Sequence, residues 1–273
     1  VFTYTLSDGT ATHTATLTIT VSSSNNAPSA TNDTDAVNED ATITESSGSK
    51  LLVADDTDAD SDTLTVTQIK VTGGSNSSVA GSSTYNSNFT SVTGTYGTLK
   101  VGADGSYTYV ADRSAADDLD ASDTATDSFT YTVSDGTDTD TATLIITVTG
   151  INDAPVADDE TGAVNEDATL TVTDGTSDVL YGDTDADDSA SLTVSAIRTG
   201  AEGGSGTAGS IGSGLTGTYG TLTVAADGTY TYVADQSAAD DLDASDTATD
   251  VFTYTVSDGS ATDTATLTIT ITG

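Results

Sequence analysis

The sequence lacks cysteine, methionine and tryptophan, and it contains only two prolines. Without cysteine the chain has no disulfide, the usual cross-link of small extracellular domains. Aromatic residues make up 5% of the chain, so any core must be built from Val, Leu, Ile, Ala and a few Tyr and Phe. A thin core without disulfides needs another stabiliser, and bound metal ions are the obvious candidate.

Basic residues are also scarce, with five Lys and Arg against 43 Asp and Glu and a net charge of −38. Nucleic acids and anionic membranes are therefore excluded as partners, because their charge has the same sign. No apolar run is long enough to span a bilayer, so we expect no membrane insertion of these residues. High charge with few aromatics is typical of disorder, but the regular alternation of apolar residues predicts a folded chain.

The sequence repeats itself over the length of a domain. Phe-Thr-Tyr-Thr begins at Phe2, Phe129 and Phe252, which predicts two whole repeats, residues 25–150 and 151–273. Residues 1–24 match the end of a repeat, and we interpret them as the C-terminal hairpin of a preceding, truncated repeat. A lone hairpin cannot bury its apolar face. It must therefore pack in cis or be exchanged between chains.

Within each repeat the apolar residues alternate with period two, which is typical of half-buried strands. Phe129, Tyr131 and Val133 face one way, and the Asp135-Gly136 turn leads into an equally alternating return strand. A change of parity predicts β-bulges near Gln68 and Ala196. No segment shows helical periodicity. We expect six or seven strands per repeat, at residues 37–44, 64–71, 97–101, 107–110, 129–134 and 142–149 of the first. The fold class is therefore all-β, with tandem immunoglobulin-like or cadherin-like antiparallel β-sandwich repeats.

Acidic residues cluster at 55–62 and again at 183–188. Alternate carboxylates in an extended turn converge, and like charges about 4 Å apart repel by ~1 kcal/mol even in water. A cation relieves this repulsion. Oxygen ligands suit Ca²⁺, whereas the lack of Cys and the single His argue against zinc or copper. The alternative interpretation is a solvated acidic loop.

The order of several short motifs resembles that of cadherins. These are Asn152-Asp153-Ala154-Pro155, Val164-Asn165-Glu166, Asp183-Thr184-Asp185 and Leu242-Asp243. More closely, the sequence looks like the VCBS repeats of large secreted bacterial adhesins. The motifs that carry this resemblance are Asp-Gly-x-Tyr-Thr-Tyr and, after it, Phe-Thr-Tyr-Thr-Val-Ser-Asp-Gly. The resemblance implies an extracellular location on the bacterial surface, calcium ions between successive sandwiches, and a role as an extender that carries an adhesive domain.

The resemblance also implies a set of calcium ligands. For the junction around Asn152 they are Glu39, Asp120, Asn152, Asp153, Asp183, Asp185, Asp187 and Asp258. For the earlier junction they are Asn25, Asn26, Asp56, Asp58, Asp60 and Asp135, while Glu166 and Asp243 would face a following repeat. Asp135 and Asp258 have an alternative interpretation as ordinary turn residues.

A second acidic patch at residues 117–127 recurs at 240–250, and it either binds its own ion or forms a solvated loop. His13, the only histidine, is expected on the outward face of its strand, and we do not expect an enzyme. The leading function is a calcium-stiffened extender whose partners are neighbouring repeats of the same chain. Two alternatives stay open: a subunit of an extracellular filament of like chains, and a module whose outward Thr row at residues 14–20 meets a glycan or ice.

Overall fold

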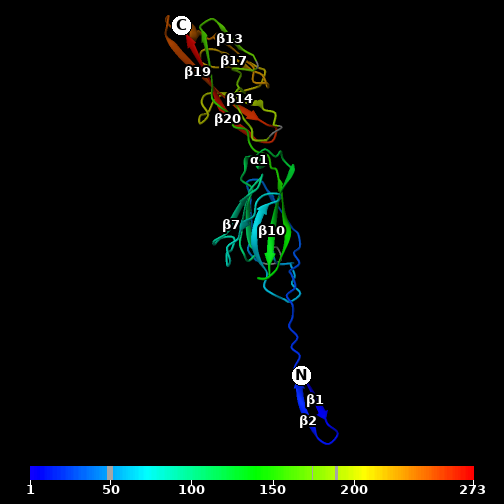
Figure 1. Cartoon of the computed structure of the whole chain (residues 1–273). Helices are drawn as coiled ribbons and strands as arrows, with labels where there is room; N and C mark the ends of the chain where they lie inside the picture. The colour runs from blue at the N-terminus through cyan, green and yellow to red at the C-terminus, as the bar shows by residue number, and fades with distance from the viewer. Residues whose placement is uncertain (48–51, 174, 188–189) are drawn as a thin grey trace.

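The computed structural model describes residues 1–47, 52–173, 175–187 and 190–273. Asp188 of the predicted acidic cluster lies outside these residues. Figure 1 shows three parts in a row: a hairpin at the N-terminus, then two β-sandwiches that lie end to end. An extended segment separates the hairpin from the first sandwich, and the short helix α1 lies where the two sandwiches meet.

The hairpin consists of β1 (Phe2–Ser7) and β2 (Thr12–Leu17), which pair with each other in a separate two-stranded sheet. Its turn is closed by Asp8, whose Oδ1 accepts hydrogen bonds from the backbone N–H groups of Thr10 at 2.8 Å and Ala11 at 2.7 Å. Gly9 has a φ of +91°, a conformation that favours glycine. Asp8 and Gly9 match Asp135 and Gly136, the pair from which a tight turn is predicted in the first repeat.

The first sandwich is built from the following elements. They are β3 (Asp33–Asn38), β4 (Thr42–Glu45), β5 (Thr65–Val71), β6 (Ser77–Ser78), β7 (Thr90–Thr93), β8 (Thr98–Val101), β9 (Tyr107–Val110), α1 (Ser114–Asp117), β10 (Thr124–Ser134) and β11 (Thr139–Thr149). One sheet has the order β3-β11-β10-β5-β6 and the other the order β4-β9-β8-β7.

The second sandwich repeats this plan. Its elements are β12 (Glu160–Asn165), β13 (Thr169–Val172), β14 (Thr193–Thr199), β15 (Ala208–Gly209), β16 (Leu215–Thr216), β17 (Thr221–Val224), β18 (Tyr230–Val233), α2 (Ser237–Asp240), β19 (Thr247–Ser257) and β20 (Thr262–Thr272). Its sheets have the orders β12-β20-β19-β14-β15 and β13-β18-β17-β16.

The long central hairpin of each repeat carries the core, as the alternation predicts. Phe129, Tyr131 and Val133 on β10 are fully buried, and Tyr109 of the opposite sheet meets Phe129 edge to face with ring centroids 6.1 Å apart. The predicted bulges are confirmed, because the register of β5 and β14 against their neighbours shifts at these positions. The antiparallel sandwich is also confirmed, with one parallel pair in each repeat, β3 with β11 and β12 with β20.

Three expectations about local structure are wrong. The described residues of each sandwich form nine strands, β3 to β11 and β12 to β20, and not six or seven, because short edge strands such as β6 and β15 add to the count. Residues 37–44 do not form one strand, because Asp40 takes a left-handed conformation with φ +56° and turns β3 into β4. Two helices of four residues each, α1 and α2, end at Asp117 and Asp240, where the acidic patches begin. Such helices are too short to produce a helical period in the sequence. Neither approaches the length needed to cross a membrane.

Candidate metal centre

Glu39 lies at the end of the first sandwich, directly before the left-handed turn that separates β3 from β4. Its N–H donates to the carbonyl of Thr149 at the end of β11, at 3.0 Å. Its side chain is only 1% exposed, and Oε1 accepts a hydrogen bond from the N–H of Ile151 at 2.5 Å. The glutamate is therefore held against the first residues of the linker to the second repeat.

Gly150 places the loop after α1 against the same linker. Its N–H donates to the carbonyl of Asp123 at 2.9 Å, and its own carbonyl accepts from the N–H of Ser122 at 3.0 Å. A Cβ at Gly150 would lie 2.3 Å from the carbonyl oxygen of Asp120, so only glycine allows this approach. The contact fixes Asp120 and the end of α1 beside the linker.

The second repeat reaches the linker from the other side. Asp187 Oδ2 accepts from the N–H of Asp153 at 3.1 Å, and Asp185 Oδ1 accepts from the N–H of Asp187 at 3.0 Å. A surface hollow at the junction is lined by Asp120 of the first repeat together with Asn152, Asp187 and Asp258. The structure therefore brings acids of both repeats together around one linker.

Asp258 takes part in a turn and also contacts the linker, so its two interpretations are compatible. Its Oδ1 accepts from the N–H groups of Ser260 at 2.5 Å and Ala261 at 2.7 Å, as a turn residue does. Its Oδ2 accepts from the side-chain amide of Asn152 at 2.9 Å. These hydrogen bonds, led by that from Ala261, lower the pKa of Asp258 below its usual value.

Burial disfavours negative charge on the other junction acids. It is the largest cause of the raised pKa values of Glu39, Asp153 and Asp187. The neighbouring charges that raise these values further are all carboxylates. Asp117, at the end of α1, is one of them for both Glu39 and Asp153. The centre therefore combines desolvation with repulsion between like charges.

Three buried carboxylate oxygens at the junction accept no hydrogen bond within the described part of the chain. They are Glu39 Oε2, Asp185 Oδ2 and Asp187 Oδ1. A buried charged oxygen without a partner is costly, and hard oxygen donors of this kind fit a hard cation such as Ca²⁺. Among the described residues, no three Asp, Glu or His side chains already converge to hold one ion.

The earlier junction shows the same contacts on the side of the first repeat. Asp60 Oδ2 accepts from the backbone and side-chain N–H groups of Asn26 at 2.7 and 3.0 Å. Asp58 Oδ1 accepts from the N–H of Asp60 at 2.8 Å, and Asp58 Oδ2 is buried without a hydrogen bond. Asp135 Oδ2 accepts a hydrogen bond from the side-chain amide of Asn25 at 2.9 Å. The predicted residues of this half-junction, except Asp56, are thus brought together.

Asp56 and Asp183 lie elsewhere. Asp183 Oδ1 accepts from the N–H of Asp158 at 2.8 Å, and Asp56 makes the equivalent contact with the N–H of Thr31 at 2.7 Å. Burial, followed by the charges of Asp158 and Asp263, raises the pKa of Asp183 to about 6. The charges that act on it most belong to its own repeat, and its Oδ2, like that of Asp56, is buried without a hydrogen bond within the described residues.

The far end of the second repeat carries Glu166 and Asp243. The N–H of Glu166 donates to the carbonyl of Thr272 at 2.8 Å, which reproduces the backbone contact of Glu39. Its side chain is only partly buried, and Asp243 is exposed. The backbone geometry of the glutamate is therefore built into each repeat, whereas its complete burial occurs at the junction.

Sequence reasoning missed the roles of two acids. Asp117 is the last residue of α1, and its charge acts on both Glu39 and Asp153. Asp127 has the same parity as Phe129 on β10 and is 3% exposed. It accepts hydrogen bonds from the N–H groups of Thr95, Tyr96 and Gly97 and from the hydroxyl of Tyr109. The sequence did contain a signal for this buried carboxylate, because Asp127 is an acid at a strand position that faces the core.

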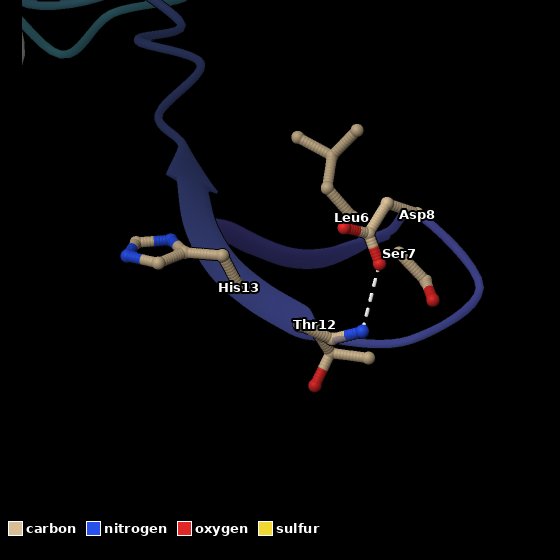
Figure 2. Close-up of a pocket in the computed structure, with 6 residues that line it drawn as sticks. Leu6, Ser7, Asp8, Thr12 and His13 are labelled. Atoms are coloured by element: carbon tan, nitrogen blue, oxygen red, sulfur yellow. Dashed lines mark hydrogen bonds between the residues drawn. The ribbon is translucent and has the colours of Figure 1, made fainter.

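A second hollow lies at the tip of the N-terminal hairpin, lined by Leu6, Asp8 and His13 among others (Figure 2). His13 pairs with Leu6 across the strands, so it shares the face of Leu6, and the expectation that it points outward is wrong. Residues 13, 15 and 17 have one parity and the threonines between them the other. Within the described residues the strands of the hairpin pair only with each other, and His13 has no place in the junction centre.

Solved structures with similar folds were found, at low similarity. An endo-fucoidan hydrolase from glycoside hydrolase family 107 is 18% identical with a TM-score of 0.30, over 99% of this chain and 34% of that one. Mouse protocadherin-24 EC1-3 is 14% identical with a TM-score of 0.42, over 99% of this chain and 78% of that one. Human mucin-like protocadherin EC1-2 has the same identity and TM-score, over 89% and 97%. This chain thus spans about a third of the hydrolase.

No curated protein sequence matches the chain. The sequence model of the bacterial cadherin-like domain matches it twice, at residues 25–150 and 152–273. These two matches correspond to the two sandwiches and together account for most of the chain. The protein therefore belongs to the bacterial cadherin-like domain family.

Proposed function

We propose that this chain is a structural extender segment of an extracellular bacterial array, stiffened by calcium at the junctions between its repeats. The observation that supports this most directly is the set of buried, unpartnered carboxylate oxygens of Glu39, Asp185 and Asp187. They come from both repeats and surround one linker. The repeated motifs favour VCBS-type adhesins as the setting, and the family is consistent with an extracellular location.

The residues have distinct parts in this proposal. Glu39 and Asp120 supply the face of the first repeat, Asp153 and the carbonyl groups of the linker lie between, and Asp185 and Asp187 supply the face of the second. Ca²⁺ binds roughly six to eight oxygen atoms and provides the positive charge that these acids lack. Because the three parts would share the ion, the angle between the sandwiches becomes fixed.

Without a cation, the same acids oppose the junction. Burial and mutual repulsion both raise the pKa values of Glu39, Asp153 and Asp187, so their ionised forms are destabilised near neutral pH. We therefore expect a flexible junction in chelator and a stiff one in calcium. A mechanical role of this kind requires no catalytic group, and the acids recur in each repeat, as a structural role demands.

The chain offers a matched pair of variants to test this. Glu39→Gln removes the buried carboxylate at the junction, whereas Glu166→Gln makes the same change at the end of the second repeat. In the wild type and in Glu166→Gln, calcium should raise the melting temperature and narrow the distribution of interdomain distances measured by small-angle X-ray scattering. Glu39→Gln should lose most of both responses.

The proposal fails if chelation at constant ionic strength changes neither the melting temperature nor the scattering of the wild type. Equal loss of response in both variants would place the calcium effect outside the junction. The filament alternative requires contacts between chains, and ordered polymers of the calcium-loaded chain in electron micrographs would favour it.

A further inference from the structure

The first repeat carries a loop whose sequence the second repeat does not share. Residues 73–94 are rich in Ser and Asn, whereas residues 200–217, the corresponding loop of the second repeat, contain no Asn. The first loop contains two Asn-x-Ser/Thr sequences, at Asn76 and Asn88, and a third such sequence begins at Asn32. Asn-x-Ser/Thr is the acceptor sequence for N-linked glycosylation when the middle residue is not proline. The structure distinguishes the three asparagines.

Two of these asparagines already use their side chains within the first sandwich. Asn32 Oδ1 accepts hydrogen bonds from the N–H and the hydroxyl of Thr143, at 2.9 and 2.8 Å. Asn76 Nδ2 donates to Gln68 Oε1 at 2.6 Å. An amide side chain has one acceptor oxygen and one donor nitrogen, and a glycosyltransferase must hold both. Asn32 and Asn76 would therefore have to give up contacts within the fold before they could react.

Asn88 is free of such contacts. It is exposed and has a left-handed backbone conformation with φ +54°, which asparagine adopts more readily than most residues. Its side chain makes no hydrogen bond within the described part of the chain. Phe89, which follows it, is 39% exposed. Thr90 begins β7, and its hydroxyl donates to the carbonyl of Ser78 at 2.9 Å on the surface. The acceptor sequence is therefore ordered and accessible.

The charge around Asn88 also favours a reaction with an anionic donor. The donor in N-glycosylation is a sugar activated by phosphate groups, which the net charge of −38 would repel. Residues 63–103, however, contain no Asp or Glu, and they include Lys70 and Lys100. Lys100 Nζ lies 5.0 Å from the centroid of the Phe89 ring. A positive charge therefore lies beside the acceptor sequence of Asn88, whereas an acid, Asp33, directly follows Asn32.

We propose that Asn88 is an N-glycosylation site on the side of the first sandwich. Its Nδ2 atom attacks the anomeric carbon of a sugar that is carried on a diphosphate. The new C–N bond forms as the bond between the anomeric carbon and the phosphate oxygen breaks. The diphosphate leaves with the electron pair, and the amide nitrogen loses one proton to a base of the transferase. Nucleotide-linked and lipid-linked sugars share this chemistry.

An attached sugar would protect the side of the sandwich where β6 and β7 lie, each the last strand of its sheet. Such edge strands can pair with the strands of other molecules, and natural proteins block this with charge or with a covering group. Residues 73–94 contain no charged side chain, whereas the corresponding loop of the second repeat contains Glu202. The sugar therefore supplies cover where the sequence provides no charge.

The test is the mass of the peptide that contains Asn88, taken from the 273-residue chain produced in the organism that encodes it. Trypsin releases residues 71–100, and fragmentation of this peptide should place a sugar on Asn88. Asn88→Gly keeps the left-handed turn, and Thr90→Val removes the hydroxyl but keeps the shape of the side chain. Both variants should lose the added mass, whereas Asn76→Gln, the matched control, should retain it.

Two further samples identify the donor. The unmodified chain, purified from a host without N-glycosylation, is incubated either with cytosol and nucleotide-linked sugars or with membranes that contain lipid-linked sugars. Transfer to Asn88 in one sample and not in the other assigns the donor. The proposal is overturned if Asn88 of the chain from its own organism carries no sugar, or if the sugar is on Asn32 or Asn76 instead. No junction acid is changed, so this result would leave the calcium-stiffened extender untouched.

Discussion

Replacing Asp127 by Asn should destabilise the first repeat severely, and the structure shows why. The carboxylate is 3% exposed and accepts four hydrogen bonds. Its Oδ1 receives the N–H of Thr95 at 2.8 Å, and its Oδ2 receives those of Tyr96 and Gly97, each at 3.1 Å, and the Tyr109 hydroxyl at 2.7 Å. An amide has one acceptor oxygen and turns its NH₂ group toward the remaining donors, so at least one buried backbone donor loses its partner.

The size of the effect follows from these contacts. Losing hydrogen bonds to a charged acceptor costs about 1.5–3 kcal/mol each, so the loss of one or two amounts to ~1.5–6 kcal/mol. For a domain of this size, each kcal/mol lowers the melting temperature by roughly 3–5 °C, which gives a drop of ~5–30 °C. Asp250 makes the same four contacts in the second repeat, so Asp250→Asn should lower the melting of that repeat by a similar amount.

Differential scanning calorimetry and hydrogen exchange of the full chain assign each loss to one repeat, the other serving as the internal control. Both variants should be measured in calcium and in chelator. If Asp127 and Asp250 stabilise their repeats through hydrogen bonds, the drop in melting temperature should persist in chelator. The reasoning is refuted if Asp127→Asn lowers melting by less than about 3 °C, or if the loss vanishes when calcium is removed from both proteins, as an ion bound by the second acidic patch would require.

Three further outcomes follow from the structure. Gly150→Ala should weaken the response of the melting temperature to calcium at least as much as Glu39→Gln, because its Cβ would lie 2.3 Å from the Asp120 carbonyl oxygen; calcium titration calorimetry measures this. In chelator, the first repeat should become more stable as pH falls from about 7.5 to about 5, by ~1 kcal/mol, since the side chain of Asp33 is partly exposed. Burial is the chief cause that raises the pKa of Asp33 to about 6 from its ordinary 3.8. The folded state therefore takes up the proton first and loses this stability as pH rises through about 6, and Asp33→Asn should flatten the profile in pH-dependent melting. Tyr131→Phe removes the hydroxyl that donates to Asp33 at 2.6 Å and to the Thr31 carbonyl at 2.7 Å, and chemical denaturation should show a loss of about 1–3 kcal/mol.

The periodic parts of the fold were predictable from the sequence, and the reason is local. Phe129, Tyr131 and Val133 alternate with threonines, and a buried face in a strand requires that alternation. The break between β3 and β4 was not predictable, because the left-handed residue is Asp40 and not glycine. The four-residue helix α1 left no period in the sequence, yet it places Asp117 beside the junction acids.

The sequence was enough to predict which acids lie near the candidate site. It was not enough to predict which of them face the linker and which face their own sandwich. Asp183 and Asp185 are two residues apart, and both were assigned to the junction. The structure turns Asp183 toward the N–H of Asp158 and its own sandwich, while Asp185 contacts Asp187. Spacing in an irregular loop does not reveal which way each side chain points, because that depends on which backbone N–H groups the rest of the fold brings within reach.

Glu39 and Glu166 occupy one position of the repeat in two settings, and their difference shows how neighbouring repeats depend on each other. Both form the same backbone contact with the last strand of their sandwich. Only Glu39, which has the linker and a second repeat beside it, is fully buried. Its Oε1 accepts a hydrogen bond from the N–H of Ile151, whereas its Oε2 accepts none within the described residues. Docking of the next repeat therefore imposes a desolvation cost on the preceding one that the protein's own hydrogen bonds only partly offset. Under the proposed function the cation offsets the rest, so each junction is stable only where calcium and both neighbours are present, and the stiffness of an array would be set junction by junction.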